Sequence, residues 1–205
     1  MNTIDVVAAQ THFSSVDPCM SVELDRYLSS GTPLPMPVAK EEYFSRLVRG
    51  IVGQQISTKA AHSIYQKLGT LVSITPETIR TSDSLTLKAA GLSTNKVRSV
   101  KELAGVWPTL TVNLWIDQSN ESIRKQLTPF FGIGVWTVDM FLLFAMARSD
   151  IFSVNDLGLR KRISQLYSVD SDDHGSIEAI ADAWSPHRSV AALVLWHGLD
   201  NAPAL

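Results

Sequence analysis

Residues 127–163, LTPFFGIGVWTVDMFLLFAMARSDIFSVNDLGLRKRI, decide the fold expected for this chain. Pro129 ends a helix that begins near Asn120, and an apolar helix starts after Gly134, so a tight hairpin links two helices. Gly132 and Gly134 let the backbone turn with positive φ and leave no Cβ to block a close approach. The start of the second helix then offers free N–H groups to an anion, although a Gly-x-Gly pair is also typical of an ordinary loop.

The rest of the chain carries the start and stop signals of further helices. A capping residue or a first-turn proline marks their starts at Ser57, Thr75-Pro76, Ser93, Asn120 and Ser185-Pro186. Gly69 and Gly91 are expected to close two of these helices. Apolar residues recur at helical spacing, and neither an alternating strand pattern nor an internal repeat occurs. The sequence therefore predicts an all-α fold.

The domain organisation expected is a short N-terminal attachment followed by one main body. Residues 1–40 should hold a helix near Met20 to Leu28 and an extended, proline-rich connection, GTPLPMPVAK, that pack on the body. The body is expected over residues 41–205, with the hairpin at 127–137.

Composition excludes several protein classes. The chain has 205 residues and is 45% hydrophobic, enough to bury a core. Its apolar stretches are shorter than the roughly 20 residues that cross a bilayer. One cysteine, Cys19, excludes an internal disulfide and a multi-cysteine metal cluster. The first residues lack the basic segment of a secretory signal, so we expect a cytoplasmic protein, or a nuclear one in a eukaryote.

Charge is distributed unevenly along the chain. Residues 1–45 hold 2 basic and 6 acidic side chains, residues 46–162 hold 15 and 8, and residues 163–205 hold 1 and 6. The middle segment thus carries a net charge of +7 in a chain whose total is −2. A positive middle can present a basic face to a polyanion such as DNA, and the alternative is a chance distribution over a solvated surface.

Four segments resemble the helix-hairpin-helix DNA glycosylase superfamily, and within it the alkylation-repair branch, the 3-methyladenine DNA glycosylases II. They occur in the family's order and read FSRLVRGIVGQQISTKAAHSIYQKL (44–68), FFGIGVWT (130–137), VNDLG (154–158) and WSPHRSVAALVLW (184–196). The resemblance implies two helical lobes with a cleft between them. It also implies a monofunctional enzyme that hydrolyses the N-glycosidic bond of alkylated purines in double-stranded DNA and so initiates base excision repair.

The resemblance assigns the catalytic carboxylate to Asp156. An alkylated purine such as 3-methyladenine carries a positive charge, so it leaves without strong protonation. One fixed carboxylate can then stabilise the oxocarbenium-like sugar and orient water. The alternative is that Asp156 only caps a helix starting at Leu157, and both roles can coexist.

Turning a base out of the duplex requires a side chain to fill the gap. By resemblance Gln55 is this wedge, where the bacterial prototype has an apolar residue. The alternative is that Gln54 and Gln55 satisfy backbone groups at a helix end.

A pocket for the extruded base should be aromatic, because an electron-deficient ring gains from stacking. Trp136 and Trp196 match the family's pocket tryptophans, and either is also compatible with an ordinary core position. Met140 and Leu157 fall where the prototype has tyrosine, so specificity is expected to differ from it.

The expected contacts to DNA phosphates are Gly132, Gly134, Thr137, Lys96, Arg160 and Lys161, whereas Arg162 is expected to face solvent. In this superfamily the hairpin commonly holds a monovalent cation, Na⁺ or K⁺, which implies the backbone carbonyls of Thr128, Phe130 and Ile133 as ligands. No cofactor is expected to be required, a single cysteine excludes an iron–sulfur cluster, and a monomer is expected.

Two other functions remain open from the sequence. One is a non-enzymatic helix-hairpin-helix DNA-binding module, which leaves Asp156 and the tryptophans unexplained. The other is a glycosylase for deaminated or mispaired bases. Relatives that also cut the strand have a lysine two residues after the second hairpin glycine, and Trp136 at that position implies base removal alone.

Overall fold

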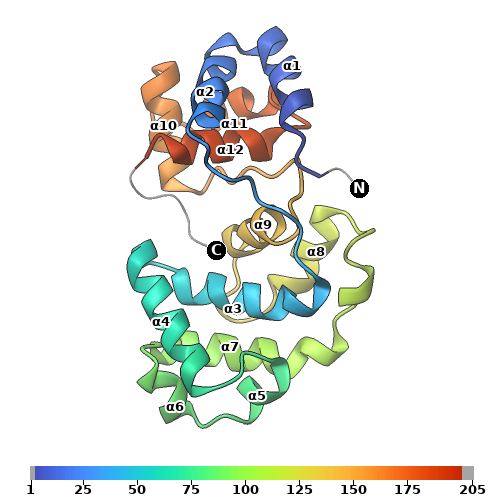
Figure 1. Cartoon of the computed structure of the whole chain (residues 1–205), viewed down its shortest axis with the longest axis vertical. Helices are drawn as coiled ribbons and strands as arrows, with labels where there is room; N and C mark the ends of the chain where they lie inside the picture. The colour runs from blue at the N-terminus through green and yellow to red at the C-terminus, as the bar shows by residue number, and fades with distance from the viewer. Residues whose placement is uncertain (1–2, 200–205) are drawn as a thin grey trace. The chain divides into compact units, whose positions relative to one another are not determined.

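The computed structural model describes residues 3–199 (Figure 1). Within this range the regular structure is helical, and the β-type pairing consists of one isolated bridge between Thr3 and Arg148. The all-α prediction is confirmed. The elements are α1 (Val6–Val16), α2 (Pro18–Ser29), η1 (Lys40–Glu42), α3 (Tyr43–Gly53), α4 (Thr58–Leu71), α5 (Pro76–Thr81), α6 (Ser84–Ala89), α7 (Thr94–Val106), η2 (Trp107–Thr109), η3 (Val112–Leu114), α8 (Asn120–Leu127), α9 (Val135–Phe144), α10 (Leu157–Tyr167), α11 (His174–Asp182) and α12 (Arg188–His197).

The chain divides into two compact units. Of the described residues, 3–36 and 142–199 form one, which we call the terminal unit, and 37–141 form the other, the middle unit. The division falls within α9, between Phe141 and Leu142. Each unit has its own buried apolar side chains and is described by itself.

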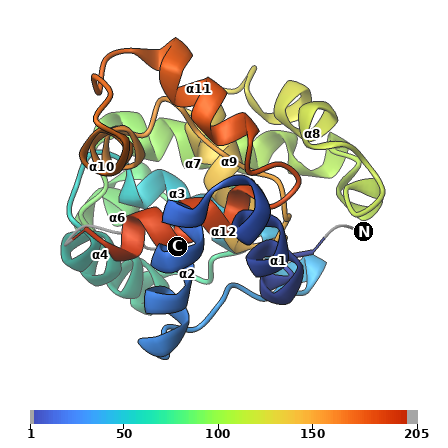
Figure 2. The ribbon, with the colours of Figure 1, turned by 90° about the horizontal axis from the view of Figure 1, so that it is seen from above.

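The terminal unit is built around α12. This helix is apolar on every side, and the side chains from Ser189 to Trp196 are all buried. It packs against α2 and α10, and Figure 2 shows it in red beside α2 in blue. α1 packs on α2, with Phe13 and Leu24 fully buried in this layer.

In the middle unit, α3 packs against α4 and α7 and presents Leu47, Val48 and Ile51 to the core. An aromatic cluster closes one end, where Trp115 stacks on Tyr43 with ring centroids 6.1 Å apart and meets Phe141 edge-on at 5.7 Å. These contacts fix the start of α3 near α9. None of the helices among residues 3–199 has the length and apolar character needed to span a membrane.

Most of the expected helix boundaries are confirmed. The side chains of Ser57, Thr75 and Ser93 each cap a helix by accepting a backbone N–H. The cap of α8 is Ser119, one residue before the expected Asn120. α12 starts at Arg188, two residues later than expected from Pro186.

Two further boundaries differ from expectation. α4 continues through Gly69 to Leu71, because glycine destabilises a helix by only about 1 kcal/mol relative to alanine and the buried Leu68 holds the last turn in place. The N-terminal region contains α1 in addition to the expected helix, which is α2. Asp5 caps α1 by accepting the N–H groups of Val7 and Ala8.

Candidate functional site

Asp156 is the N-cap of α10 in the terminal unit. Its Oδ1 accepts the backbone N–H of Leu159 at 2.9 Å and the indole Nε1–H of Trp196 at 3.1 Å. The residue is only 9% exposed. The cap predicted as the alternative is thus present, and the helix N-terminus and the two N–H donors hold the carboxylate in one position.

Trp196 comes from α12 and is 2% exposed. Its ring stacks on Phe144 with centroids 5.8 Å apart and planes inclined by 25°. One edge of the indole is therefore used to hold Asp156, and one face packs on α9. This geometry suits a positioning function. At 2% exposure the indole has almost no surface for an extruded base in this structure, so the base-pocket function stays a prediction.

Gly158, which was not identified from the sequence, leaves room for the hydrogen bond between Asp156 and Trp196. A Cβ at this position would lie 3.0 Å from Asp156 Oδ1 and 3.6 Å from Trp196 Cδ1. Leu157, one residue earlier, is 50% exposed and so offers an accessible apolar surface beside the carboxylate.

The basic residues of α10 are arranged differently from expectation. Arg160 Nη1 donates to the Ser171 carbonyl at 2.9 Å and to Asp172 Oδ1 at 3.0 Å, so this guanidinium is engaged by the loop after α10. Lys161 is exposed. The expectation that Arg162 faces solvent is wrong, because its Nη2 pairs with Glu23 Oε2 of α2 at 2.9 Å. The packing of α2 on this unit carried no signal in the sequence around Arg162.

The hairpin between α8 and α9 lies in the middle unit. Gly132 has φ +76°, and a Cβ on it would collide with Ser99 Oγ. Gly134 is exposed, its φ is not positive, and a Cβ on it would meet no protein atom within 4 Å. The expectation of positive φ is confirmed for Gly132 and wrong for Gly134, which directly precedes α9 and accepts the Val138 N–H on its carbonyl.

Side chains from α7 hold the hairpin in place. Glu102 Oε1 accepts the Phe131 backbone N–H at 2.9 Å, and the Arg98 guanidinium lies 3.8 Å from the centroid of the Phe131 ring. Neither residue was identified from the sequence. A carboxylate four residues after an arginine on one helix is common, so the pattern alone gave no signal.

The turn after α3 carries the predicted wedge. Gln55 is exposed and has φ +59°, a left-handed conformation that is uncommon for a residue other than glycine. Gln54 points inward, and its Nε2 donates to the Gly132 carbonyl and to Thr137 Oγ1, both at 2.8 Å. Gln54 therefore does satisfy a backbone group, but the group belongs to the hairpin and not to a helix end, as the alternative had it.

Two expected phosphate contacts are engaged inside the middle unit. Lys96 Nζ donates to the carbonyls of Val52 at 2.7 Å and Gln54 at 2.8 Å, and burial lowers the pKa of this ammonium. Thr137 is 3% exposed, and its Oγ1 accepts a hydrogen bond from Gln54 Nε2. Both side chains therefore have structural bonds that compete with a phosphate.

The remaining pocket residues lie on α9. Trp136 is half-buried. Met140 is fully buried, so it has no surface that a base could contact in this structure.

The oxygens expected to hold a cation at the hairpin are the backbone carbonyls of Thr128, Phe130 and Ile133. The Phe130 carbonyl accepts the Ile133 N–H at 3.1 Å and keeps a second lone pair. This donor type fits an alkali cation. Within residues 3–199, no group of three or more His, Cys, Asp or Glu side chains is arranged to hold a metal ion.

The model of the HhH-GPD superfamily of base excision DNA repair proteins matches residues 48–187. This chain belongs to that superfamily. It is 31% identical over 167 residues to DNA-3-methyladenine glycosylase 1 of Schizosaccharomyces pombe, covering 77% of this chain and 72% of that protein. It is 26% identical over 166 residues to DNA-3-methyladenine glycosylase 2 of Escherichia coli, covering 75% of this chain and 57% of that protein.

Solved structures show the same likeness. The S. pombe 3-methyladenine DNA glycosylase (Mag1) in complex with abasic DNA matches with a TM-score of 0.82 and 27% identity, covering 96% of this chain and 100% of that one. A DNA-3-methyladenine glycosidase from Bacillus halodurans matches with a TM-score of 0.74 and 28% identity, covering 92% and 87%.

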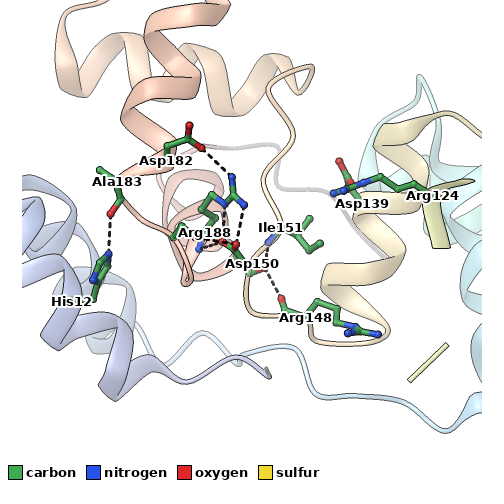
Figure 3. Close-up of polar contacts among 11 residues, drawn as sticks. His12, Arg124, Asp139, Arg148, Asp150, Ile151, Asp182, Ala183 and Arg188 are labelled. Carbon is green, nitrogen blue, oxygen red and sulfur yellow. Dashed lines mark hydrogen bonds and ion pairs between the residues drawn. The ribbon is translucent and has the colours of Figure 1, made fainter. Parts of the chain in front are cut away.

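This HhH-GPD chain also contains a buried ion pair that sequence reasoning missed. Arg124 of α8 donates from Nε to Asp139 Oδ1 of α9 at 2.7 Å, and Asp139 is 2% exposed (Figure 3). Burial raises the pKa of the Asp139 carboxyl, and the Arg124 charge opposes this shift. The pair joins the two helices that flank the hairpin. The signal available was an acidic residue interrupting an apolar run.

Proposed function

We propose that this chain is a monofunctional DNA glycosylase that hydrolyses the N-glycosidic bond of alkylated purines in double-stranded DNA. The observation that carries the proposal is the carboxylate of Asp156, which is held by the Leu159 and Trp196 N–H groups. The S. pombe and E. coli relatives, both named DNA-3-methyladenine glycosylases, support the substrate class. The S. pombe structure in complex with abasic DNA supports DNA as the partner.

The chemistry follows from the charge of the substrate. A purine methylated at N3 or N7 is cationic, so its glycosidic bond breaks with the base as a neutral leaving group. Positive charge then develops on the sugar, and the Asp156 carboxylate stabilises it electrostatically. The same carboxylate accepts a proton from the water that attacks the anomeric carbon. Two N–H donors on Oδ1 fix the carboxylate before the reaction, so little reorganisation is needed.

Most of the proposed DNA contacts are assigned to the middle unit. The exposed Gly134 and the N-terminus of α9, where the helix dipole is positive, bind a backbone phosphate. Carbonyls of Thr128, Phe130 and Ile133 would hold Na⁺ or K⁺, whose charge would attract a phosphate. The exposed Gln55 fills the space left by the extruded base.

The remaining proposed contacts are with the extruded base and with one phosphate. The accessible surface of Leu157, beside Asp156, contacts the extruded base. The base-pocket functions expected of Trp136, Met140 and Trp196 stay predictions. Lys161 contributes a phosphate contact. We propose that the protein acts as a monomer.

The test is base release from DNA treated with a methylating agent. The protein is incubated with methylated genomic DNA, and the freed bases are separated by chromatography, with a no-protein sample for spontaneous loss. Release of 3-methyladenine and 7-methylguanine above that background is the expected result. Release of uracil or thymine from deaminated or mispaired DNA, without release of methylated purines, would favour the other glycosylase class. DNA binding with no base release would favour a binding module.

A further inference from the structure

Lys96 of α7 holds the turn that carries Gln55. Lys96 Nζ donates to the Val52 and Gln54 carbonyls, which lie at the C-terminal end of α3 and on either side of Gly53. The last carbonyls of a helix have no partner within the helix, so the ammonium acts as a cap. It fixes the backbone directly before Gln55, whose left-handed conformation needs such support.

The same face of α7 holds the hairpin. Ser99 lies against Gly132, and Glu102 accepts the Phe131 N–H. Lys96, Ser99 and Glu102 are spaced three residues apart, so they lie along one side of the helix. One rigid element therefore contacts both the wedge turn and the hairpin.

Gln54 connects the wedge turn and the hairpin directly. Its backbone carbonyl accepts from Lys96, and its side chain donates to the Gly132 carbonyl and to Thr137 Oγ1. A single residue thus belongs to both polar networks. Movement of the turn relative to the hairpin would break the two Gln54 bonds, and movement relative to α7 would break the two Lys96 bonds.

We propose that Lys96 and Gln54 are positioning residues that hold Gln55 at a fixed place relative to the hairpin. The proposal rests on the proposed function, in which the hairpin grips the DNA backbone and Gln55 enters the stack. A pre-organised wedge loses little conformational freedom on insertion, and its depth is set by where the hairpin binds the phosphate. Lys96 therefore acts on base extrusion, and its charge contributes little to phosphate binding.

The variants are Lys96→Met and Gln54→Ala, which remove the donors without adding charge. Lys101→Met is the matched control, because it removes the same charge from the same helix, and its Nζ reaches only the Arg80 carbonyl at 3.4 Å among the contacts described. Lys96→Arg keeps the donors and should restore most of the function. Thermal unfolding of each variant shows that it is folded.

The substrates are two duplexes with one 7-methylguanine, paired with cytosine or mispaired with adenine. A mispaired base is easier to extrude, so it depends less on the wedge. We expect Lys96→Met and Gln54→Ala to lower the single-turnover rate about tenfold on the paired duplex and by no more than about twofold on the mispaired one. Lys101→Met should leave the ratio of the two rates unchanged. Equal losses on both duplexes, or no loss on either, would overturn the proposal.

A second readout does not depend on base release. A 2-aminopurine beside the 7-methylguanine becomes brighter when its neighbour leaves the stack, and the wild-type protein should give this signal on binding. Lys96→Met and Gln54→Ala should reduce the signal at saturating protein, whereas Lys101→Met should not. If the wild-type protein extrudes the base but releases none, the proposed function fails and the positioning function stands. A signal as large in both variants as in wild type would contradict the positioning function.

Discussion

Trp196 Nε1 donates a hydrogen bond to Asp156 Oδ1 at 3.1 Å, which joins the start of α10 to the end of α12 through one buried carboxylate. Phe144 stacks on the same indole, so the orientation of the donor is fixed from a second side. A carboxylate that must face a developing positive charge benefits from a fixed position. In the proposed reaction the tryptophan therefore acts through Asp156.

Trp196→Phe should lower base release and leave the fold intact. Phenylalanine keeps most of the packing on Phe144 and loses the N–H donor to Asp156. A hydrogen bond to a charged group contributes about 1.5–3 kcal/mol, so we expect the single-turnover rate to fall at least about tenfold. Trp184→Phe is the control, since it removes an indole donor from Asp17 instead. Trp184→Phe should reduce stability and leave the rate unchanged. An unaltered rate in Trp196→Phe would contradict the positioning function of Trp196.

The two hairpin glycines should respond differently to alanine. Gly132→Ala introduces a collision with Ser99 at a positive φ and should destabilise the middle unit. Gly134→Ala meets no protein atom within 4 Å, so the melting temperature should not fall. A methyl group at the start of α9 would obstruct a phosphate, and DNA affinity should fall about tenfold in a titration with labelled duplex. Unchanged affinity in Gly134→Ala would show that the phosphate does not approach this residue.

The helical fold could be predicted because its signals are local. Ser57, Thr75 and Ser93 cap helices as expected, since a short polar side chain before an apolar-periodic segment is sufficient for this function. The hairpin could be placed for the same reason, from Pro129 and the glycines. Gly69 does not end α4 as predicted, because packing of Leu68 outweighs a small local preference.

Contacts between distant segments could not be predicted. The pairing of Arg162 with Glu23 joins residues 139 positions apart. The bonds of Lys96 to the end of α3 depend on how α7 packs on α3. The donors to Asp156 show both cases, because Leu159 is within the local cap and Trp196 reaches it only through the tertiary fold.

Asp150 and Arg188 should make the stability of the terminal unit depend on acidic pH. Arg188 donates from Nε to Asp150 Oδ1 at 2.7 Å and from Nη1 to Asp182 Oδ1 at 3.1 Å (Figure 3). Burial alone would raise the pKa of Asp150, but the hydrogen bonds and charge of Arg188 outweigh it and hold the pKa below its ordinary value. The resulting stabilisation is complete above about pH 4 and is lost as the pH falls through the lowered pKa.

Asp150→Asn should therefore lower the free energy of unfolding by about 2 kcal/mol at neutral pH. The difference from wild type should shrink as the pH falls below about 4. Urea unfolding at a series of pH values measures it, and Asp182→Asn, at a side chain that is 71% exposed, is the control expected to have a much smaller effect. A deficit in Asp150→Asn that is constant with pH would mean that the ion pair does not cause it.

The enzyme should leave an intact abasic site. Strand cleavage through a protein imine needs an amine that attacks the sugar, and the indole of Trp136 has no basic lone pair. Lys125 is exposed on α8 and pairs with Glu121 at 3.7 Å. Borohydride treatment of the protein with a damaged duplex should give no covalent adduct, and strand breaks should appear only after hot alkali. An adduct abolished by replacing one lysine would assign the nucleophile to that lysine instead of water.

The most direct test of the account is the single-turnover rate of 7-methylguanine release by Asp156→Asn. Asparagine is nearly the same size, and its carbonyl oxygen can accept the Leu159 and Trp196 N–H groups, so the fold and the DNA affinity should be kept. Losing the negative charge removes transition-state stabilisation on the order of 3–4 kcal/mol, and the rate should fall at least about a hundredfold. A variant that is folded, binds DNA as wild type does and keeps half of the wild-type rate would contradict the assignment of Asp156 as the catalytic residue.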